Sequence, residues 1–130
     1  MKVLGLIPSR MESKRLPAKS LLPISGLPLV IHTYRRANLS KLLNKTLICT
    51  DSKKIIQTAK KFKSKAVLTS PYHKNGTERI AEALIKEKTK YDLIVDIQGD
   101  EPLISPYHID EVIRFHKKNL DADIILPTLK

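Results

Sequence analysis

The chain has 130 residues, one cysteine and a formal net charge of +11, which fits one domain with one core. A single cysteine excludes an internal disulfide, and no apolar run approaches the roughly 20 residues that a membrane-spanning helix needs. The first residues lack a signal-peptide cleavage pattern, so we expect a cytoplasmic protein without a membrane partner. Basic residues are spread along the chain without interleaved aromatics, so we expect no nucleic-acid partner.

Strand and helix patterns alternate along the chain. Short apolar runs predict strands at 3–7, 46–50, 66–68 and 93–97, and the start of another at 124–126. Apolar residues three and four apart predict helices at 29–37, at 53–62, from Gly76 onward and after the pair Ser105-Pro106. Such alternation predicts an α/β fold with a mostly parallel sheet and helices on both faces.

The helices carry more detailed expectations about caps and buried faces. Either Asp51 or Ser52 can cap the helix at 53–62, and Ser105 is the expected cap of the last helix. Apolar spacing predicts the buried stripe of the helix from Gly76 as Ile80, Ala81, Leu84 and Ile85. The same spacing predicts the buried stripe of the last helix as Ile109, Val112, Ile113 and His116. Cys49, inside an apolar strand, is read as a buried hydrophobe.

Parallel sheets bind ligands at the carboxyl ends of their strands, so the segments after strands one, three and four are the candidate site. Residues 8–20 hold the first of these segments, with four cations at Arg10, Lys14, Arg15 and Lys19 and no glycine. Cations and backbone N–H groups in such a loop can bind a polyphosphate. Neither the Walker nor the dinucleotide glycine pattern is present. On composition alone, an ordinary solvated basic loop is an equal alternative.

An ordered motif in this segment resembles the sugar-acid cytidylyltransferases, which include the CMP-KDO and CMP-sialate synthetases (KDO is 3-deoxy-manno-octulosonate). The motif I-P-x-R-x-x-S-x-R-L-P-x-K runs from Ile7 to Lys19. Further resembling blocks are C-T-D at 49–51, H-K-N-G-T-E-R at 73–79 and V-D-I-Q-G-D-E-P at 95–102. The Q-G-D-E-P form favours the KDO branch. The resemblance implies a Rossmann-like nucleotidyltransferase fold in which residues 1–130 form the CTP-binding part.

The resemblance also implies transfer of CMP from CTP to the anomeric hydroxyl of KDO, with release of pyrophosphate, for lipopolysaccharide biosynthesis. Lys19 and Asp100 are the implied catalytic residues, and Asp100 is the implied ligand of Mg²⁺, although an Asx turn is its structural alternative. The implied nucleotide-binding residues are Pro8, Ser9, Arg10, Arg15, Lys19, Asn75, Gly76, Thr77, Arg79 and Gln98.

Several readings of these residues stay open. Gln98 could contact either the nucleotide or the sugar, Thr77 is also a plausible helix cap, and His73 in a turn is more often structural. The chain departs from the family pattern with Ser9 in place of the usual alanine and Asn75 in place of serine.

Enzymes of the resembled family are longer, so we expect a chain truncated at its C-terminus. The missing part would carry a second metal-binding aspartate, most sugar contacts and much of the interface of a full-length homodimer. One alternative is a cytidylyltransferase for a related sugar acid, of the amino-KDO or sialic type. A second is an inactive nucleotide-binding fragment that needs a partner chain, and a third is a basic module that binds polyanions.

Overall fold

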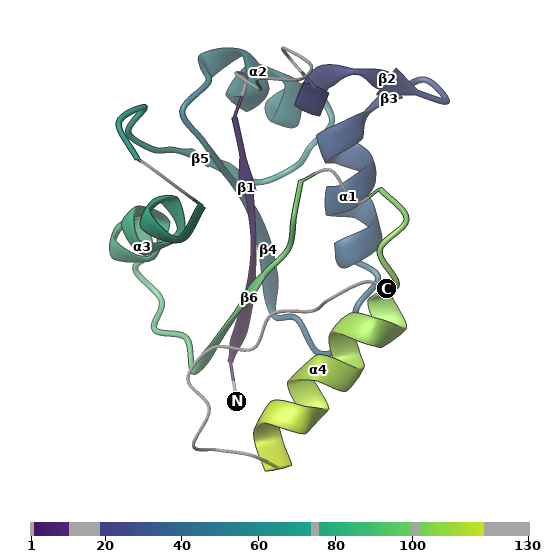
Figure 1. Cartoon of the computed structure of the whole chain (residues 1–130), viewed down its shortest axis with the longest axis vertical. Coiled ribbons are helices and arrows are strands. Elements are labelled where there is room, and N and C mark those ends of the chain that lie inside the picture. Colours follow the sequence, from purple (N-terminus) through teal and green to yellow (C-terminus); the bar gives the residue numbers. More distant parts are fainter. Residues whose placement is uncertain (1, 11–18, 74–75, 100–101, 119–130) are drawn as a thin grey trace.

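The computed structural model describes residues 2–10, 19–73, 76–99 and 102–118. Its elements in chain order are β1 (Val3–Ser9), η1 (Lys19–Leu21), β2 (Pro23–Ile24), β3 (Leu27–Pro28), α1 (Leu29–Ala37), β4 (Lys45–Thr50), α2 (Lys53–Lys61), β5 (Ala66–Leu68), α3 (Gly76–Lys86), β6 (Leu93–Asp96) and α4 (Pro106–Lys118). Strands β5, β4, β1 and β6 lie in that order in one sheet, and every pairing is parallel (Figure 1). The predicted parallel sheet is confirmed, while the strand expected from 124 lies outside the described residues.

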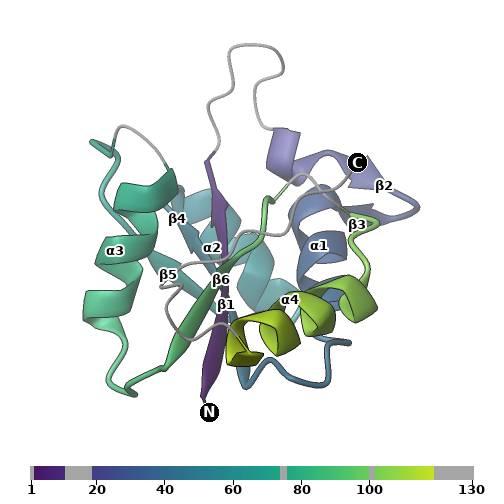
Figure 2. The ribbon, with the colours of Figure 1, turned by 60° about the horizontal axis from the view of Figure 1, so that its bottom comes forward.

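Side chains of β1 alternate between two hydrophobic cores. Val3 and Ile7 pack in the core that α1, α2 and α4 cover, whereas Leu4 and Leu6 pack in a smaller core with Ala83 of α3. Figure 2 shows α3 on one side of the sheet and α1 and α4 on the other. A strand buried on both faces is typical of the middle of a parallel sheet. The prediction of helices on both faces is therefore confirmed.

Helix starts follow the capping signals of the sequence. Ser52, rather than Asp51, caps α2, because its Oγ accepts a hydrogen bond from the Ile55 N–H at 3.2 Å. Ser105 caps α4 as predicted, with its Oγ 3.2 Å from the His108 nitrogen. Among the described residues, no helix combines the length and the apolar content needed to cross a bilayer.

The buried face of α3 differs from the predicted stripe. Ala81 is exposed and Ile85 is 84% exposed, whereas Arg79 and Ala83 are buried and the other two members of the stripe are half-buried. The prediction was wrong for Ala81 and Ile85 because a charged residue occupies a buried position at 79. Apolar periodicity alone cannot recognise a buried arginine, so the stripe was placed partly out of phase.

A short hairpin leads into α1. Strands β2 and β3 pair antiparallel around Ser25 and Gly26, whose φ angles are 50° and 84°. Two successive positive φ angles form the tight primed turn that suits a two-residue hairpin. The Leu29 N–H donates to the Leu22 carbonyl at 2.9 Å, so the hairpin ties η1 to the start of α1.

Candidate functional site

The strand order places a topological switch point between β1 and β6. From β1 the chain moves outward to β4 and β5, and it then returns to the other side of β1 to form β6. The order of the strands therefore reverses at β1, and open parallel sheets bind ligands at the carboxyl ends of the strands beside such a point. Pro8 and Ser9 end β1, Arg10 follows it, and Gln98 lies just beyond β6. The structure thus brings these four predicted site residues to the carboxyl ends of two neighbouring parallel strands.

The segments after β1 and β6 are in direct contact at Gly99. A Cβ atom on Gly99 would lie 2.6 Å from Ser9 Oγ and 3.2 Å from the Pro8 carbonyl oxygen. Both distances are shorter than ordinary van der Waals contacts, so the backbone approach requires glycine. The glycine at this corner therefore has a physical cause in the packing against β1.

Two side chains of α1 hold the connection between β6 and α4. Thr33 Oγ1 is buried and donates to the Gly99 carbonyl at 3.0 Å. Arg36 Nε donates to the Ile104 carbonyl at 3.1 Å. Asp100, the predicted catalytic and metal-binding residue, lies in the sequence between these two anchored points and outside the described residues.

The Ser9 hydroxyl is a buried polar group with no hydrogen-bond partner within the described part of the chain. Ser9 is only 4% exposed and sits at the end of β1 against Gly99. Buried hydroxyls in folded proteins are normally satisfied, so an unpartnered one at the ligand-binding edge marks a polar position that a ligand or water can complete.

The two described ends of the basic segment meet. Ser20 Oγ donates to the Arg10 carbonyl at 3.5 Å, which brings η1 beside the end of β1. Lys19, the first residue of η1, is half-buried, and Arg10 is exposed. Arg15 lies outside the described residues. Of the three predicted phosphate-binding cations, Arg10 and Lys19 therefore lie on segments that are joined at this edge.

Arg79, another predicted nucleotide ligand, is buried and bonded within the protein. It is 4% exposed, and its Nη1 donates to Thr69 Oγ1 at 2.8 Å and to the Ser70 carbonyl at 3.4 Å. Its Nη2 lies 3.9 Å from Asp51 Oδ2. Asp51, one of the two candidate caps of α2, is instead an ionic partner of Arg79. These contacts tie the segments after β4 and β5 to α3.

The other predicted residues of this block lie at the start of α3. Gly76 is the first residue of the helix, Thr77 is exposed in its first turn, and Asn75 lies outside the described residues.

A carboxylate that sequence reasoning did not single out organises the loop before α3. Glu82 accepts hydrogen bonds from the Ser70 N–H and from Lys86 Nζ, both at 2.8 Å, and its Oε1 lies 2.8 Å from His73 Nε2. The bond from Lys86, followed by those from Ser70 and His73, lowers the pKa of Glu82 to about 2. The expected structural role of His73 agrees with this contact. The Glu-to-Lys spacing of four residues was the available sequence signal.

Cys49 is buried in the smaller core, as predicted. Burial is the main cause that raises the pKa of its thiol to about 12, and the charges of Arg79 and Asp96 act on it in opposite directions. A thiol in this environment is unreactive. Across the described ranges, no three His, Cys, Asp or Glu side chains gather into a possible metal site.

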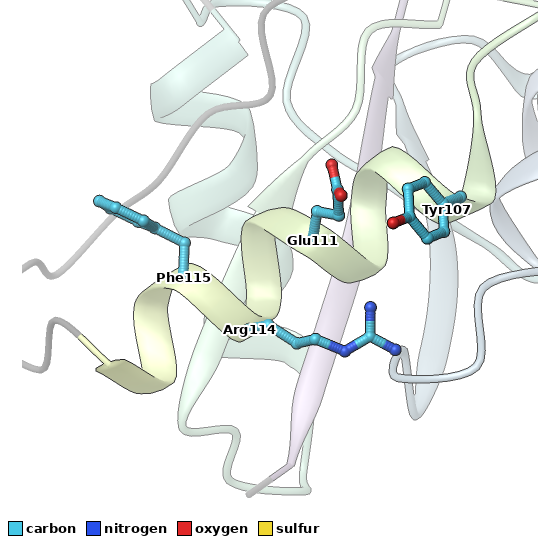
Figure 3. Close-up of a pocket in the computed structure, with 4 residues that line it drawn as sticks. All are labelled: Tyr107, Glu111, Arg114 and Phe115. Carbon is cyan, nitrogen blue, oxygen red and sulfur yellow. The ribbon is translucent and has the colours of Figure 1, made fainter.

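A surface pocket of about 380 Å³ lies elsewhere, on the outer face of α4. Its lining residues are Tyr107, Glu111, Arg114 and Phe115. Figure 3 shows the four side chains spreading from a single helix. A hydrogen bond to Glu111 raises the pKa of Tyr107. The pocket shares no residue with the switch-point site and none of its residues was predicted to bind a ligand.

Comparison with known proteins identifies the family. The family model described as cytidylyltransferase matches residues 4–125. The chain is 40% identical over 121 residues to the mitochondrial 3-deoxy-manno-octulosonate cytidylyltransferase of Arabidopsis thaliana, covering 93% of this chain and 42% of that protein. It is 42% identical over 119 residues to the 8-amino-3,8-dideoxy-manno-octulosonate cytidylyltransferase of Shewanella sp. (strain W3-18-1), covering 91% and 49%. The chain thus spans about half the length of these relatives.

A solved structure agrees with this result. CMP:2-keto-3-deoxy-manno-octonic acid synthetase, solved in complex with CTP, superposes with a TM-score of 0.88 at 32% identity, covering 92% of this chain and 49% of that one. The predicted nucleotidyltransferase fold is confirmed, together with the resemblance on which it rested. Because the family model matches nearly the whole sequence, this chain belongs to the cytidylyltransferase family.

Proposed function

We propose that residues 1–130 form the CTP-binding part of an enzyme that transfers CMP from CTP to the anomeric hydroxyl of KDO and releases pyrophosphate. The observation that carries the proposal is the contact of Gly99 with Pro8 and Ser9, which joins two family motifs at the switch point of the sheet. The names of the relatives support this substrate class. The product serves lipopolysaccharide biosynthesis, and we place the enzyme in the cytoplasm.

The reaction is a phosphoryl-group displacement with simple atom balance. The anomeric oxygen of the sugar acid forms a bond to the α-phosphorus while the bond from that phosphorus to the bridging oxygen breaks. Pyrophosphate leaves with the electron pair, and the hydroxyl proton is released. Arg10, Arg15 and Lys19 neutralise the triphosphate, and Lys19 stabilises the charge that builds on the leaving group.

The rest of the nucleotide is held by backbone and short side chains. Pro8 and Ser9 present the end of β1 to the cytosine, and Gln98 lies across the switch point from them. The start of α3, at Gly76 and Thr77, lines the other wall, where free N–H groups of a helix N-terminus favour an anionic or acceptor group. Asn75, which precedes the helix in the sequence, is proposed as a further nucleotide ligand. Arg79 supports this wall through Thr69 and Ser70.

The donor set at the corner after Gly99 fits Mg²⁺. This ion prefers oxygen ligands and is commonly held by one or two carboxylates together with substrate phosphates. Asp100 supplies one carboxylate next to a glycine whose position is fixed against β1 and α1. When bound, the ion would neutralise phosphate charge. The described part of the chain contributes the fixed position of Gly99, the residue that precedes this carboxylate in the sequence.

Two sugar acids are candidates for the substrate that accepts CMP. Relatives named for KDO and for its 8-amino analogue match this chain equally well, so a related sugar acid is the second candidate. In the full-length form, which we propose to be a homodimer, further residues contact the sugar acid. No nucleic-acid partner is proposed.

Calorimetry of CTP binding to this chain in Mg²⁺ buffer tests the proposal. We expect CTP to bind more tightly than ATP or GTP, and Asp100→Ala to weaken binding. Asp92→Ala, at the opposite end of β6, is the matched control and should leave binding unchanged. Equal binding of all three nucleotides, unaffected by Asp100→Ala, would contradict a cytidylyltransferase pocket. Pyrophosphate release with KDO or 8-amino-KDO in the full-length form then distinguishes the two sugars.

A further inference from the structure

Asp96 is the one charged side chain of β6, and it lies on the face of the sheet that α3 covers. It pairs in register with Leu6, whose side chain is in the smaller core. Its charge contributes to the raised pKa of Cys49 in the same core. Burial in turn raises the pKa of Asp96 itself. A carboxyl group beside an apolar core is unfavourable for folding, so its presence at the carboxyl end of β6 calls for a reason.

The two carboxyl oxygens of Asp96 have different surroundings. Oδ2 accepts a hydrogen bond from Gln98 Nε2 at 3.4 Å. Oδ1 is buried and has no partner among the described residues. Pairing continues past the strand end, because the Ile97 N–H donates to the Leu6 carbonyl at 2.8 Å. Asp96 and Gln98 are therefore two residues apart on extended backbone and point to the same side.

The contact determines which end of the Gln98 amide faces outward. A glutamine side chain has an amide that donates and a carbonyl that accepts, and either can face a ligand. A carboxylate accepts but does not donate, so it holds the Nε2 end of Gln98. The carbonyl end, Oε1, then remains as the acceptor that this exposed side chain can offer a ligand.

We infer that Asp96 is a positioning residue: it fixes the side-chain amide of Gln98 so that Oε1 accepts a hydrogen bond from an amine or hydroxyl of the bound substrate. This inference rests on the proposed function. Two groups have the required chemistry, namely the exocyclic amine of cytosine and a hydroxyl of the sugar acid. A uracil base presents an acceptor at the position of that amine and cannot make the bond.

The variants separate this role from a structural one. Asp96→Leu keeps a similar volume and replaces a half-buried carboxyl on an apolar face, so it should unfold at the same or a higher urea concentration. It removes the acceptor for Gln98. Asp96→Asn keeps an acceptor oxygen and should behave as wild type. Gln98→Ala removes the positioned group itself, and Asp92→Ala controls for loss of a carboxylate just before the same strand.

Calorimetry with CTP, with UTP, and with KDO added to the CTP complex measures the effect. We expect Asp96→Leu and Gln98→Ala each to weaken the binding of either CTP or KDO about five- to tenfold, which is the effect of losing one hydrogen bond. The double variant should be no weaker than Gln98→Ala. A lost preference for CTP over UTP assigns Oε1 to cytosine, and weakened KDO binding at unchanged CTP affinity assigns it to the sugar.

Two results would overturn the inference. The first is wild-type binding of all ligands by Asp96→Leu, and the second is an additive loss in the double variant, since independent effects contradict positioning. The proposed function fails if the wild type does not bind CTP selectively. The inference alone fails if the wild type binds CTP selectively and the variants give either of these two results.

Discussion

At the scale of single residues, the corner formed by Gly99 and the end of β1 leaves the least room for change. A methyl group at 99 would meet the Ser9 hydroxyl and the Pro8 carbonyl, and the latter is backbone that cannot rotate away. We predict that Gly99→Ala lowers the free energy of unfolding by about 1–3 kcal/mol and weakens CTP binding. Urea unfolding and calorimetry measure the two effects.

The Ser9 hydroxyl provides the internal control for this prediction. Combining Gly99→Ala with Ser9→Ala removes the 2.6 Å contact but leaves the Pro8 carbonyl at 3.2 Å. The double variant should therefore recover part, but not all, of the lost stability. An unchanged stability of Gly99→Ala itself would show that the corner is looser than these distances imply.

Glu82 gives the chain a predictable response to acid. Its pKa is about 2 in the folded protein, below the ordinary value of 4.5, because Lys86, Ser70 and His73 donate to it. A carboxyl group with a lowered pKa stabilises the fold fully above 4.5, and this stabilisation is lost as the pH falls through about 2. We predict that Glu82→Gln lowers the melting temperature at neutral pH.

The difference in melting temperature between wild type and Glu82→Gln should shrink as the pH falls from 4.5 toward 2. Glu111→Gln on α4 controls for the loss of a surface carboxylate. A difference that stays constant over this pH range would show that Glu82 stabilises the fold through packing rather than through its charge.

At the scale of elements, α2 ends in a turn that its sequence does not favour. The Ser64 N–H donates to the Ala59 carbonyl at 2.8 Å, and the Lys63 N–H donates to the Lys60 carbonyl at 3.1 Å, which together form a Schellman motif. Lys63 has a φ of 56° in this motif, where glycine is the favoured residue. We predict that Lys63→Gly stabilises the protein by about 1 kcal/mol.

Urea unfolding of Lys63→Gly should be compared with that of Lys65→Gly. Lys65 lies just before β5. Glycine there increases the conformational entropy of the unfolded chain without relieving strain in the folded one, so the free energy of unfolding should fall by about 0.5–1 kcal/mol. If both variants lose stability, the left-handed position of Lys63 is not strained.

The elements themselves were largely predictable, because each depends on a local signal. Helix α1 and strand β5 have the predicted limits, and Ser52 and Ser105 are caps at the expected places. Contacts between distant segments were not predictable in the same way. Arg79 was expected to face the nucleotide, yet its buried bonds to Thr69 and Ser70 depend on how α3 packs against the sheet beside the segment that follows β5.

The candidate site likewise combines residues that motifs identified with long-range contacts that the sequence did not indicate. Family motifs identified Pro8, Arg10 and Gln98, and the sheet order brings them to one edge. The support of that edge by Thr33 joins residues 66 positions apart and has no sequence signal. Pairing of Asp96 with Gln98 had only the hint that one polar residue interrupts an apolar strand.

At the scale of the whole molecule, two surfaces compete as the place where a ligand binds: the switch-point edge and the pocket on α4. Hydrogen exchange with saturating CTP and Mg²⁺ distinguishes them, because a ligand that binds only the folded state slows local opening where it makes contact. We predict slower exchange at residues 7, 9 and 10 and at 96–99, and unchanged exchange along 107–115. The chain's charge of +11 attracts any polyphosphate, so GTP should give some protection. This protection should be weaker than that from CTP, because GTP lacks the cytosine base. Protection confined to α4 would instead place the nucleotide in the pocket of Tyr107 and Phe115, and equal protection by GTP would show charge attraction without recognition of cytosine.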